Sequence, residues 1–414
     1  MHPNFIRLGI ACFFIAPLCA APAVAENWPG WRGPQRTGLT TDTGIVTKWS
    51  ATENVLWKTA LPGSGISNPV VWEDRVFVTA SEGRDQGELH IICLDRKTGA
   101  ERWHQRLWGT APTLFYYAPS GMASPSPVTD GKHLWAFFGT GDVFCFDMDG
   151  GLVWQRALAE EYGAFENRFA ASSSPLLFED TVILQCDHYG ASYVIALDQK
   201  TGANRWKADR PEVWLSWSSP QLVPVGDHFE LAVLGSEKLD GYDPRSGSKL
   251  WTVRGLSREC VPTPILGNGL LIAVSGPNGT HIAIKPGGSG DVTDSHVAWK
   301  YDRGTSFVPS GIVLHDRYYL ADDKGIATCF EASTGKPLWK KRLGGKFTAS
   351  PVAADDKIYF TNESGSTLVL DGSKSEYTEL ERNELGEDVL ASAAISKGRF
   401  YLRTTKHLFC LGTN

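Results

Sequence analysis

The sequence predicts an all-β fold: an eight-bladed β-propeller of four-stranded antiparallel blades, closed into a ring by an N-terminal strand. Two observations predict it. One unit of about 40–50 residues recurs along the chain, which is the length of one propeller blade. Its tryptophans stand at positions 57, 103, 154, 206, 251, 299 and 339. In addition, the last copy lacks its tryptophan strand, whereas a strand of that kind stands alone before the first copy.

Residues 1–25 are typical of a secretion signal. Arg7 precedes an apolar run over residues 8–16, and Ala23-Val24-Ala25 is a small-residue cleavage site. Pro17 ends the run, which is shorter than the roughly 20 residues that a membrane-spanning helix needs. We therefore expect cleavage after Ala25 and a periplasmic or extracellular protein that does not span a membrane.

The charge balance argues against a nucleic-acid partner. The chain contains 40 Lys and Arg residues against 46 Asp and Glu residues, a formal net charge of −6, and its basic residues form no stripe. Domains that bind the phosphate backbone of nucleic acids are typically basic. We therefore expect the partners to be of another kind.

Six cysteines follow the predicted signal, and their places in the repeat argue against disulfides. Four of them occupy the same place in different copies: Cys93, Cys145, Cys329 and Cys410. Equivalent places in neighbouring blades lie farther apart than the roughly 7 Å between Cα atoms that a disulfide allows. We expect the six thiols to be buried and reduced.

Each repeat has the same internal order. It starts with a small residue and proline, as in Ser174-Pro175, and it ends in Asp-x-x-Thr-Gly followed by Trp, as in Asp198–Trp206. Stretches such as Lys357–Thr361 between these marks alternate in polarity and are rich in β-branched and aromatic residues, which indicates strands. Asp and Gly at these positions favour a hairpin turn. The Trp is large enough to fill the gap between wedge-shaped blades.

The two ends of the chain complete one blade. The eighth copy starts at Leu390-Ala391-Ser392 and stops at Leu408–Leu411 without a Trp strand, and the missing strand is Asn54–Lys58. We therefore divide the chain into a signal over residues 1–25, an extended arm over 26–53 and one propeller domain over 54–414. Blades five and seven depart from the repeat, so a seven-bladed ring with an insertion is the alternative.

The run Leu94–Trp103 resembles the tryptophan-docking repeat of the pyrroloquinoline-quinone (PQQ) repeat proteins, and similar runs stand at Leu197–Trp206 and Phe330–Trp339. The resemblance covers residues 54–414 and implies a propeller. The family includes quinoprotein dehydrogenases, which hold PQQ and Ca²⁺ in the central funnel. It also includes an eight-bladed, non-catalytic lipoprotein of the machinery that assembles outer-membrane β-barrels.

The segment Trp28–Pro34 is similar to an N-terminal motif of exported members of this family. We expect it to lie across one face of the ring, tucked in by its two tryptophans; contact with a ligand is the alternative. The dehydrogenases carry two adjacent cysteines over the quinone, and this sequence has no adjacent pair. No Cys-x-x-Cys or closely spaced carboxylate loop indicates a metal. We therefore predict no catalytic, cofactor-binding or metal-binding residues.

The segments that lead into the first strand of each blade are expected to ring the central channel, and they carry the candidate binding residues. These are Tyr116, Tyr117, Glu166, Asn167, Arg168, Trp214, Trp217, Arg258, Glu259, Phe307 and Lys346. On one interpretation, opposite charges pair across the loops and the aromatic rings plug the channel mouth. On the other, the rings stack on a sugar, a quinone or a peptide, and the charged groups hold its carboxylates.

The sequence is compatible with three functional hypotheses. The leading hypothesis is a monomeric, non-catalytic scaffold of the bacterial cell envelope that binds an envelope protein or another envelope component. The alternative is an oxidoreductase for an alcohol or a sugar that uses PQQ with Ca²⁺, with Glu166, Asn167 and Arg258 at its site. The third is a carbohydrate-binding module or hydrolase that uses Tyr117, Trp214 and Trp217.

Overall fold

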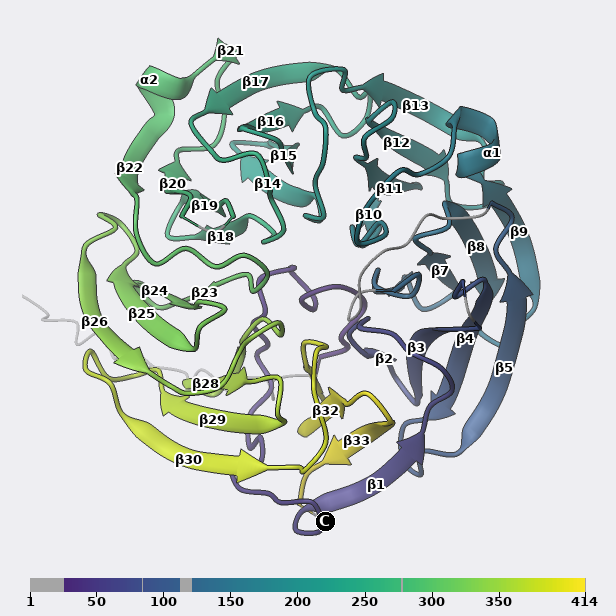
Figure 1. The fold of residues 1–414 in the computed structure, drawn as a ribbon, viewed down its shortest axis with the longest axis vertical. Helices are drawn as coiled ribbons and strands as arrows, with labels where there is room; N and C mark the ends of the chain where they lie inside the picture. Colours follow the sequence, from purple (N-terminus) through teal and green to yellow (C-terminus); the bar gives the residue numbers. More distant parts are fainter. Residues whose placement is uncertain (1–25, 84, 112–120, 277, 414) are drawn as a thin grey trace, which may run out of the picture.

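The computed structural model describes residues 26–83, 85–111, 121–276 and 278–413. The predicted signal and two candidate residues, Tyr116 and Tyr117, lie outside these ranges. The described residues form eight sheets around a central channel, and each sheet is one blade (Figure 1). The prediction of an eight-bladed all-β propeller is therefore confirmed, and the seven-bladed alternative is wrong.

Blade 1 consists of β2 (Val70–Trp72), β3 (Arg75–Glu82), β4 (Glu88–Asp95) and β5 (Glu101–Trp108). Blade 2 consists of β6 (Val128–Thr129), β7 (His133–Phe137), β8 (Asp142–Asp147) and β9 (Leu152–Ala157). Blade 3 consists of β10 (Leu176–Phe178), β11 (Thr181–Cys186), β12 (Tyr193–Asp198) and β13 (Asn204–Asp209). Blade 4 consists of β14 (Gln221–Val225), β15 (His228–Gly235), β16 (Lys238–Tyr242) and β17 (Lys249–Arg254).

Blade 5 consists of β18 (Ile265–Gly267), β19 (Leu270–Val274), β20 (His281–Ile284) and β22 (Val297–Tyr301). Blade 6 consists of β23 (Ile312–Leu314), β24 (Arg317–Ala321), β25 (Ile326–Glu331) and β26 (Pro337–Arg342). Blade 7 consists of β27 (Val352–Ala354), β28 (Lys357–Thr361), β29 (Ser366–Asp371) and β30 (Glu379–Glu384). Blade 8 consists of β31 (Ala394–Ser396), β32 (Arg399–Arg403), β33 (His407–Leu411) and β1 (Val55–Ala60).

The connection within blade 5 is structured. It contains β21 (Gly290–Asp291), which pairs in parallel with β17 and adds a fifth strand to blade 4, and then α2 (Thr293–His296). The other short helix, α1 (Leu158–Tyr162), follows blade 2. No helix among the described residues is long and apolar enough to cross a membrane.

The Trp and the Gly of the repeat meet across five of the blade boundaries in the described part of the chain, at Gly99, Gly150, Gly202, Gly247 and Gly335. A Cβ atom on Gly99 would lie 2.6 Å from the ring of Trp57, which belongs to the preceding blade. Gly99 has a φ of +71°, and the indole Nε1 of Trp57 donates to the carbonyl of Arg96 in the same turn. Only glycine leaves room for the ring and adopts this φ without strain. The repeat motif therefore acts across two blades rather than within one.

A series of hydrogen bonds, which we call the hydroxyl belt, joins the starts of the innermost strands. In each link the backbone N–H at the start of one blade donates to a side-chain hydroxyl at the start of the next blade, at 2.9–3.0 Å. The six links start at Asn68, Ser126, Ser174, Thr263, Ser310 and Ser350. The small polar residue before each inner strand therefore belongs to this belt. The six cysteines among the described residues are buried and free, as predicted.

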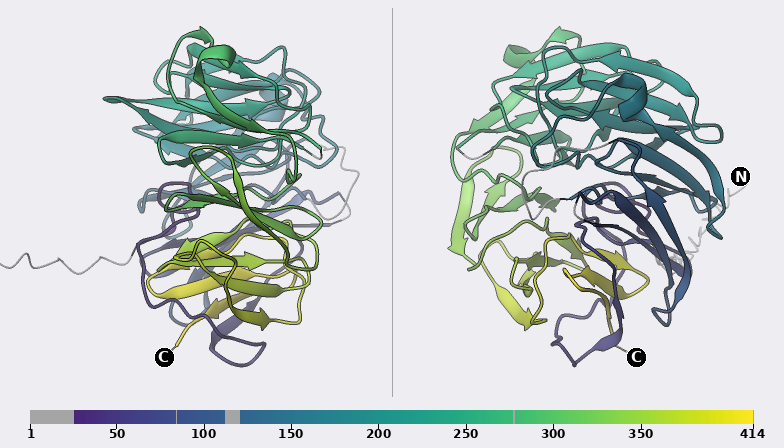
Figure 2. Two further views of the ribbon diagram at one scale, coloured as in Figure 1. Left: turned by 90° about the vertical axis from the view of Figure 1, so that its left-hand side faces the viewer. Right: turned by 45° about the vertical axis from the view of Figure 1, so that its right-hand side comes forward.

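Strand β1 pairs with β33 and closes the ring, as predicted. Figure 2 shows this N-terminal strand beside the C-terminal end of the chain. A carboxylate reinforces the closure: Glu387 accepts hydrogen bonds from Lys58 of β1 at 2.7 Å, from Thr404 at 2.6 Å and from His407 of β33 at 2.9 Å, with His407 as the donor. Burial opposes the ionisation of Glu387, but these bonds outweigh it and lower its pKa to about 2.

This closure should make stability depend on acid pH. Because the pKa of Glu387 is lower in the folded state than in the unfolded state, its contribution is present above about pH 4.5 and is lost as the pH falls towards 2. We expect Glu387→Gln to lower the free energy of unfolding by about 1–2 kcal/mol at pH 6, and by clearly less at pH 3. Urea unfolding at both pH values measures this, with the exposed Glu53→Gln as the control. An equal loss at both pH values would contradict the role of the charge.

Candidate binding site in the central channel

The propeller has two distinct faces. The loop face is formed by the loops that join the last strand of one blade to the first strand of the next. The arm face is the opposite face, and residues 26–53 lie on it, seen as the purple trace across the middle of the ring in Figure 1. Trp28 forms a β-bridge with Val71, Asn27 accepts a hydrogen bond from the N–H of Glu73, and Asp42 accepts one from the N–H of Gly398.

Two arginines, Arg32, which is buried, and Arg36, which is partly buried, fasten the arm to the channel wall. Arg32 donates to the carbonyls of Thr37 at 2.8 Å, Gly311 at 2.6 Å and Pro351 at 3.4 Å. Arg36 donates to the carbonyl of Pro175 at 3.0 Å. Burial lowers the pKa of each guanidinium to about 9, so both remain cationic at neutral pH. The arm is thereby tied to blades on opposite sides of the ring.

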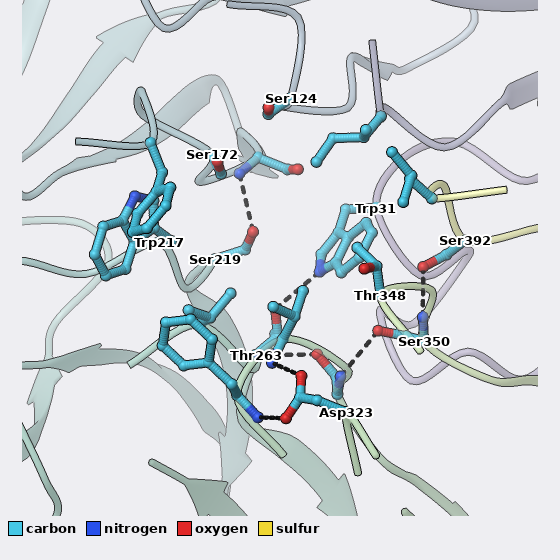
Figure 3. Close-up of a pocket in the computed structure, with 18 of the residues that line it drawn as sticks. Trp31, Ser124, Ser172, Trp217, Ser219, Thr263, Asp323, Thr348, Ser350 and Ser392 are labelled. Atoms are coloured by element: carbon cyan, nitrogen blue, oxygen red, sulfur yellow. Dashed lines mark hydrogen bonds between the residues drawn. The ribbon is translucent and has the colours of Figure 1, made fainter. Parts of the chain in front are cut away.

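Trp31 brings the arm into the channel itself. Its indole Nε1 donates to Thr263 Oγ1 of the hydroxyl belt at 2.8 Å. Above it, towards the loop face, lies a cavity of about 390 Å³, with Trp31 as its floor (Figure 3). Its lining consists of Trp31, Ile66, Ser124, Phe169, Ser172, Ser174, Trp217, Ser219, Val261, Thr263, Phe307, Val308, Ser310, Asp323, Lys346, Thr348, Ser350, Glu363, Leu390 and Ser392. This volume is within the range of small-molecule sites.

Three charged side chains are among the described residues that line this cavity, and two of them accept hydrogen bonds from other residues of the protein. Asp323 accepts the backbone N–H groups of Phe307 at 2.5 Å and Val308 at 3.2 Å, which fixes the loop before blade 6. Burial raises the pKa of Asp323. Glu363 accepts the hydroxyl of Thr348 at 2.7 Å. Lys346 is exposed and is the one cation among the described lining residues. The cavity therefore combines aromatic rings and hydroxyls with little net charge.

Of the nine predicted site residues that the structure describes, three line the cavity: Trp217, Phe307 and Lys346. Asn167 is buried beside it, and its Oδ1 accepts the indole N–H of Trp217 at 2.8 Å, so it positions that ring. Glu166 is exposed and does not line the cavity.

The remaining described candidates pair with one another on the loop face. Arg168 and Glu259 form an ion pair at 2.7 Å. The Arg258 guanidinium lies 4.2 Å from the ring centre of Trp214, as a cation–π pair. These contacts match the interpretation in which charges pair across the loops.

Sequence reasoning missed most of the cavity lining. The belt hydroxyls carry a signal, because they stand at the same place in every repeat. Trp31 lies in the segment Trp28–Pro34, for which the sequence predicts an arm across one face or a ligand contact, and no repeat marks Trp31 as part of the channel. Asp323 stands in the turn between β24 and β25, but its side chain reaches the neighbouring loop, a contact that no local pattern indicates.

The residues present do not fit a PQQ site with Ca²⁺. Of the set proposed for it, Glu166, Asn167 and Arg258 all lie outside the cavity lining. Ca²⁺ requires about six to eight oxygen ligands, and the two lining carboxylates already accept protein hydrogen bonds. A quinone that bears several carboxylates needs cationic partners, and Lys346 alone lines the described wall.

Comparison with known proteins agrees with the fold. The family profile described as "Outer membrane protein assembly factor BamB" matches residues 33–209, 190–314 and 309–407. The outer membrane protein assembly factor BamB of Yersinia pestis is 23% identical over 308 residues, which cover 69% of this chain and 70% of that protein.

Solved structures add two propellers of different function. BamB from Moraxella catarrhalis has a TM-score of 0.61 at 15% identity, covering 87% of this chain and 97% of that one. A europium-containing methanol dehydrogenase has a TM-score of 0.70 at 11% identity, covering 94% of this chain and 98% of that one. At these identities the structural likeness is one of fold, and it favours neither function.

Proposed function

Because the chain belongs to the family of the outer membrane protein assembly factor BamB, we propose that it is a non-catalytic scaffold of the bacterial cell envelope. It is exported by the segment over residues 1–25, acts as a monomer, and binds a protein partner in the assembly of outer-membrane proteins. The likeness in sequence supports this role more directly than the likeness in fold, since the family profile spans most of the propeller.

The observation that carries the proposal is a set of exposed aromatic rings on the loop face. Trp108 at the end of β5 is 72% exposed, and Trp214 in the loop before β14 is 56% exposed. Tyr189, in the turn between β11 and β12, is 47% exposed. Exposed Trp, Tyr and Arg side chains are typical anchors of protein–protein interfaces. Trp214 has such an arginine, Arg258, stacked on it.

Replacing these rings should weaken partner binding without harming the fold. We expect Trp108→Ala and Trp214→Ala each to weaken binding about 30-fold, which corresponds to about 2 kcal/mol for an anchor residue. The measurement is affinity purification of the tagged protein from solubilised envelopes, followed by mass spectrometry and by titration of the partner recovered. Leu380→Ala is the matched control, because Leu380 is 42% exposed on the outer strand β30, away from the loop face.

Outer-membrane assembly components that co-purify with the wild type and Leu380→Ala, but not with the tryptophan variants, would support the proposal. Equal recovery with all four proteins would refute the role of the loop face. The proposal includes no cofactor. Stoichiometric binding of PQQ that requires Ca²⁺, measured by calorimetric titration, would contradict it and favour the oxidoreductase.

A further inference from the structure

Three metal-ligating side chains converge at the loop-face edge of blade 1. Glu82 at the end of β3 pairs directly with Glu88 at the start of β4, and His90 follows two residues later. Because side chains alternate along a strand and paired residues share a face, all three project from the same side of the sheet. One ligand atom of each lies within 4.8 Å of the others. The predicted absence of metal ligands rested on spacing along the chain and did not include this cross-strand set.

The imidazole of His90 points into this cluster without a hydrogen-bond partner at Nε2. Its side chain is fully buried, with 0% exposure, and Nε2 has no hydrogen-bond partner among the described residues. The nearest charged atoms are Glu82 Oε2 at 3.4 Å and Glu88 Oε1 at 3.9 Å. An unpaired polar atom in a buried position is costly, so a missing partner is indicated here.

A second histidine sets the tautomer of the first. His90 Nδ1 lies 2.9 Å from His104 Nε2, and His104 Nδ1 lies 3.5 Å from Glu101 Oε2. The Glu101 carboxylate favours an N–H at His104 Nδ1, which makes His104 Nε2 the acceptor and His90 Nδ1 the donor. His90 Nε2 then carries no hydrogen, and its lone pair faces the two carboxylates.

We propose that Glu82, Glu88 and His90 bind a divalent transition-metal ion of the Zn²⁺ class. A tetrahedral ion with ligand bonds of about 2.1 Å holds its ligands about 3.4 Å apart, which matches the separation of His90 Nε2 and Glu82 Oε2. Only a small movement of the Glu88 carboxylate completes the set. An imidazole among the ligands suits Zn²⁺ and related ions, whereas Ca²⁺ and Mg²⁺ prefer oxygen ligands alone.

His104 acts as a positioning residue, since a metal-bound imidazole is usually held by a hydrogen bond to its other nitrogen. Arg106, which is paired with His90 across β4 and β5, is the competing cation. It forms no ion pair with Glu82 or Glu88 in the part of the chain that the structure describes, so the carboxylates remain open to a metal.

A metal here would tie the ends of β3 and β4 together. Glu88 is also paired across the sheet with the exposed Trp108. The ion would therefore brace the edge of the loop face that carries this ring. The inference stands on the geometry of blade 1 alone, and it does not depend on the proposed scaffold role.

Titration of the tag-free, chelator-treated protein with ZnCl₂ tests the site, with Co²⁺ absorption as a second readout of ligand geometry. We expect one ion per chain. The double variant Glu82→Gln/Glu88→Gln should bind at least tenfold more weakly, and His104→Ala about 10–100-fold more weakly. Glu73→Gln, an exposed carboxylate at the arm-face end of the same blade, should bind as the wild type does.

The double variant keeps the fold testable, because the Glu82 and Glu88 side chains are not buried and are replaced by isosteric amides. Its thermal melting in chelator should equal that of the wild type. The proposal is overturned if no stoichiometric binding is seen, if binding is unchanged in the double variant, or if Mg²⁺ or Ca²⁺ competes as well as Co²⁺. Any of these outcomes would leave the cluster as a contact between His90 and the two carboxylates without an ion.

Discussion

Removal of residues 404–414 is expected to abolish the cooperative unfolding transition of the propeller. This truncation deletes β33, whose residues Leu408–Leu411 are fully buried. It also leaves β1 without its partner and exposes the edge of β32. Burying four such side chains is worth about 1.5–3 kcal/mol each, which together approaches the 5–15 kcal/mol total stability of a typical domain. An open ring also presents two unpaired strand edges, which promote aggregation.

Circular dichroism during heating, combined with size-exclusion chromatography, measures this effect. A truncation after Gly412 is the matched control, because it removes only residues beyond β33 and should melt as the full chain does. A cooperative, monomeric transition in the shorter protein would show that seven complete blades suffice for a stable fold.

Trp28→Ala is expected to lower the free energy of unfolding by about 3–5 kcal/mol, the usual cost of replacing a buried Trp by Ala. Trp28 is fully buried although it lies in the arm rather than in a blade. A Cβ atom on Gly33 would approach its ring to 2.8 Å, and its backbone exchanges two hydrogen bonds with Val71. Without the ring, the arm loses its anchor at blade 1, and the Trp31 floor of the cavity loses its support.

Urea unfolding followed by circular dichroism gives this value. Trp108→Ala provides the comparison: the same residue type is replaced, but the ring is 72% exposed, and a change within about 0.5 kcal/mol is expected. A loss below about 1 kcal/mol in Trp28→Ala would mean that the arm is not part of the cooperative core.

The ring could be predicted because its determinants are local and repeated. The turn, the Trp and the small residue before the inner strand recur in most blades, and at least one of them marks each blade, so their spacing defines both the strands and their number. The closure of the ring was also visible, since the incomplete last copy and the isolated strand Asn54–Lys58 complement each other.

The candidate site could be predicted only in part, because its contacts join distant segments. Trp31 reaches Thr263 across 232 positions in the sequence, and no periodicity records such a contact. The loops before the inner strands supply part of the cavity lining, but the direction of each side chain depends on its neighbours. Thus Arg168 pairs with Glu259 instead of facing the channel.

The hydroxyl belt and the Trp–Gly contacts run in one direction around the molecule. Blades 1, 2, 3 and 5 each give an N–H and an indole N–H to the next blade. These four boundaries are therefore chemically alike, because the same two groups meet at each of them. A blade duplicated or lost within this set would meet its new neighbour through the same pair of contacts.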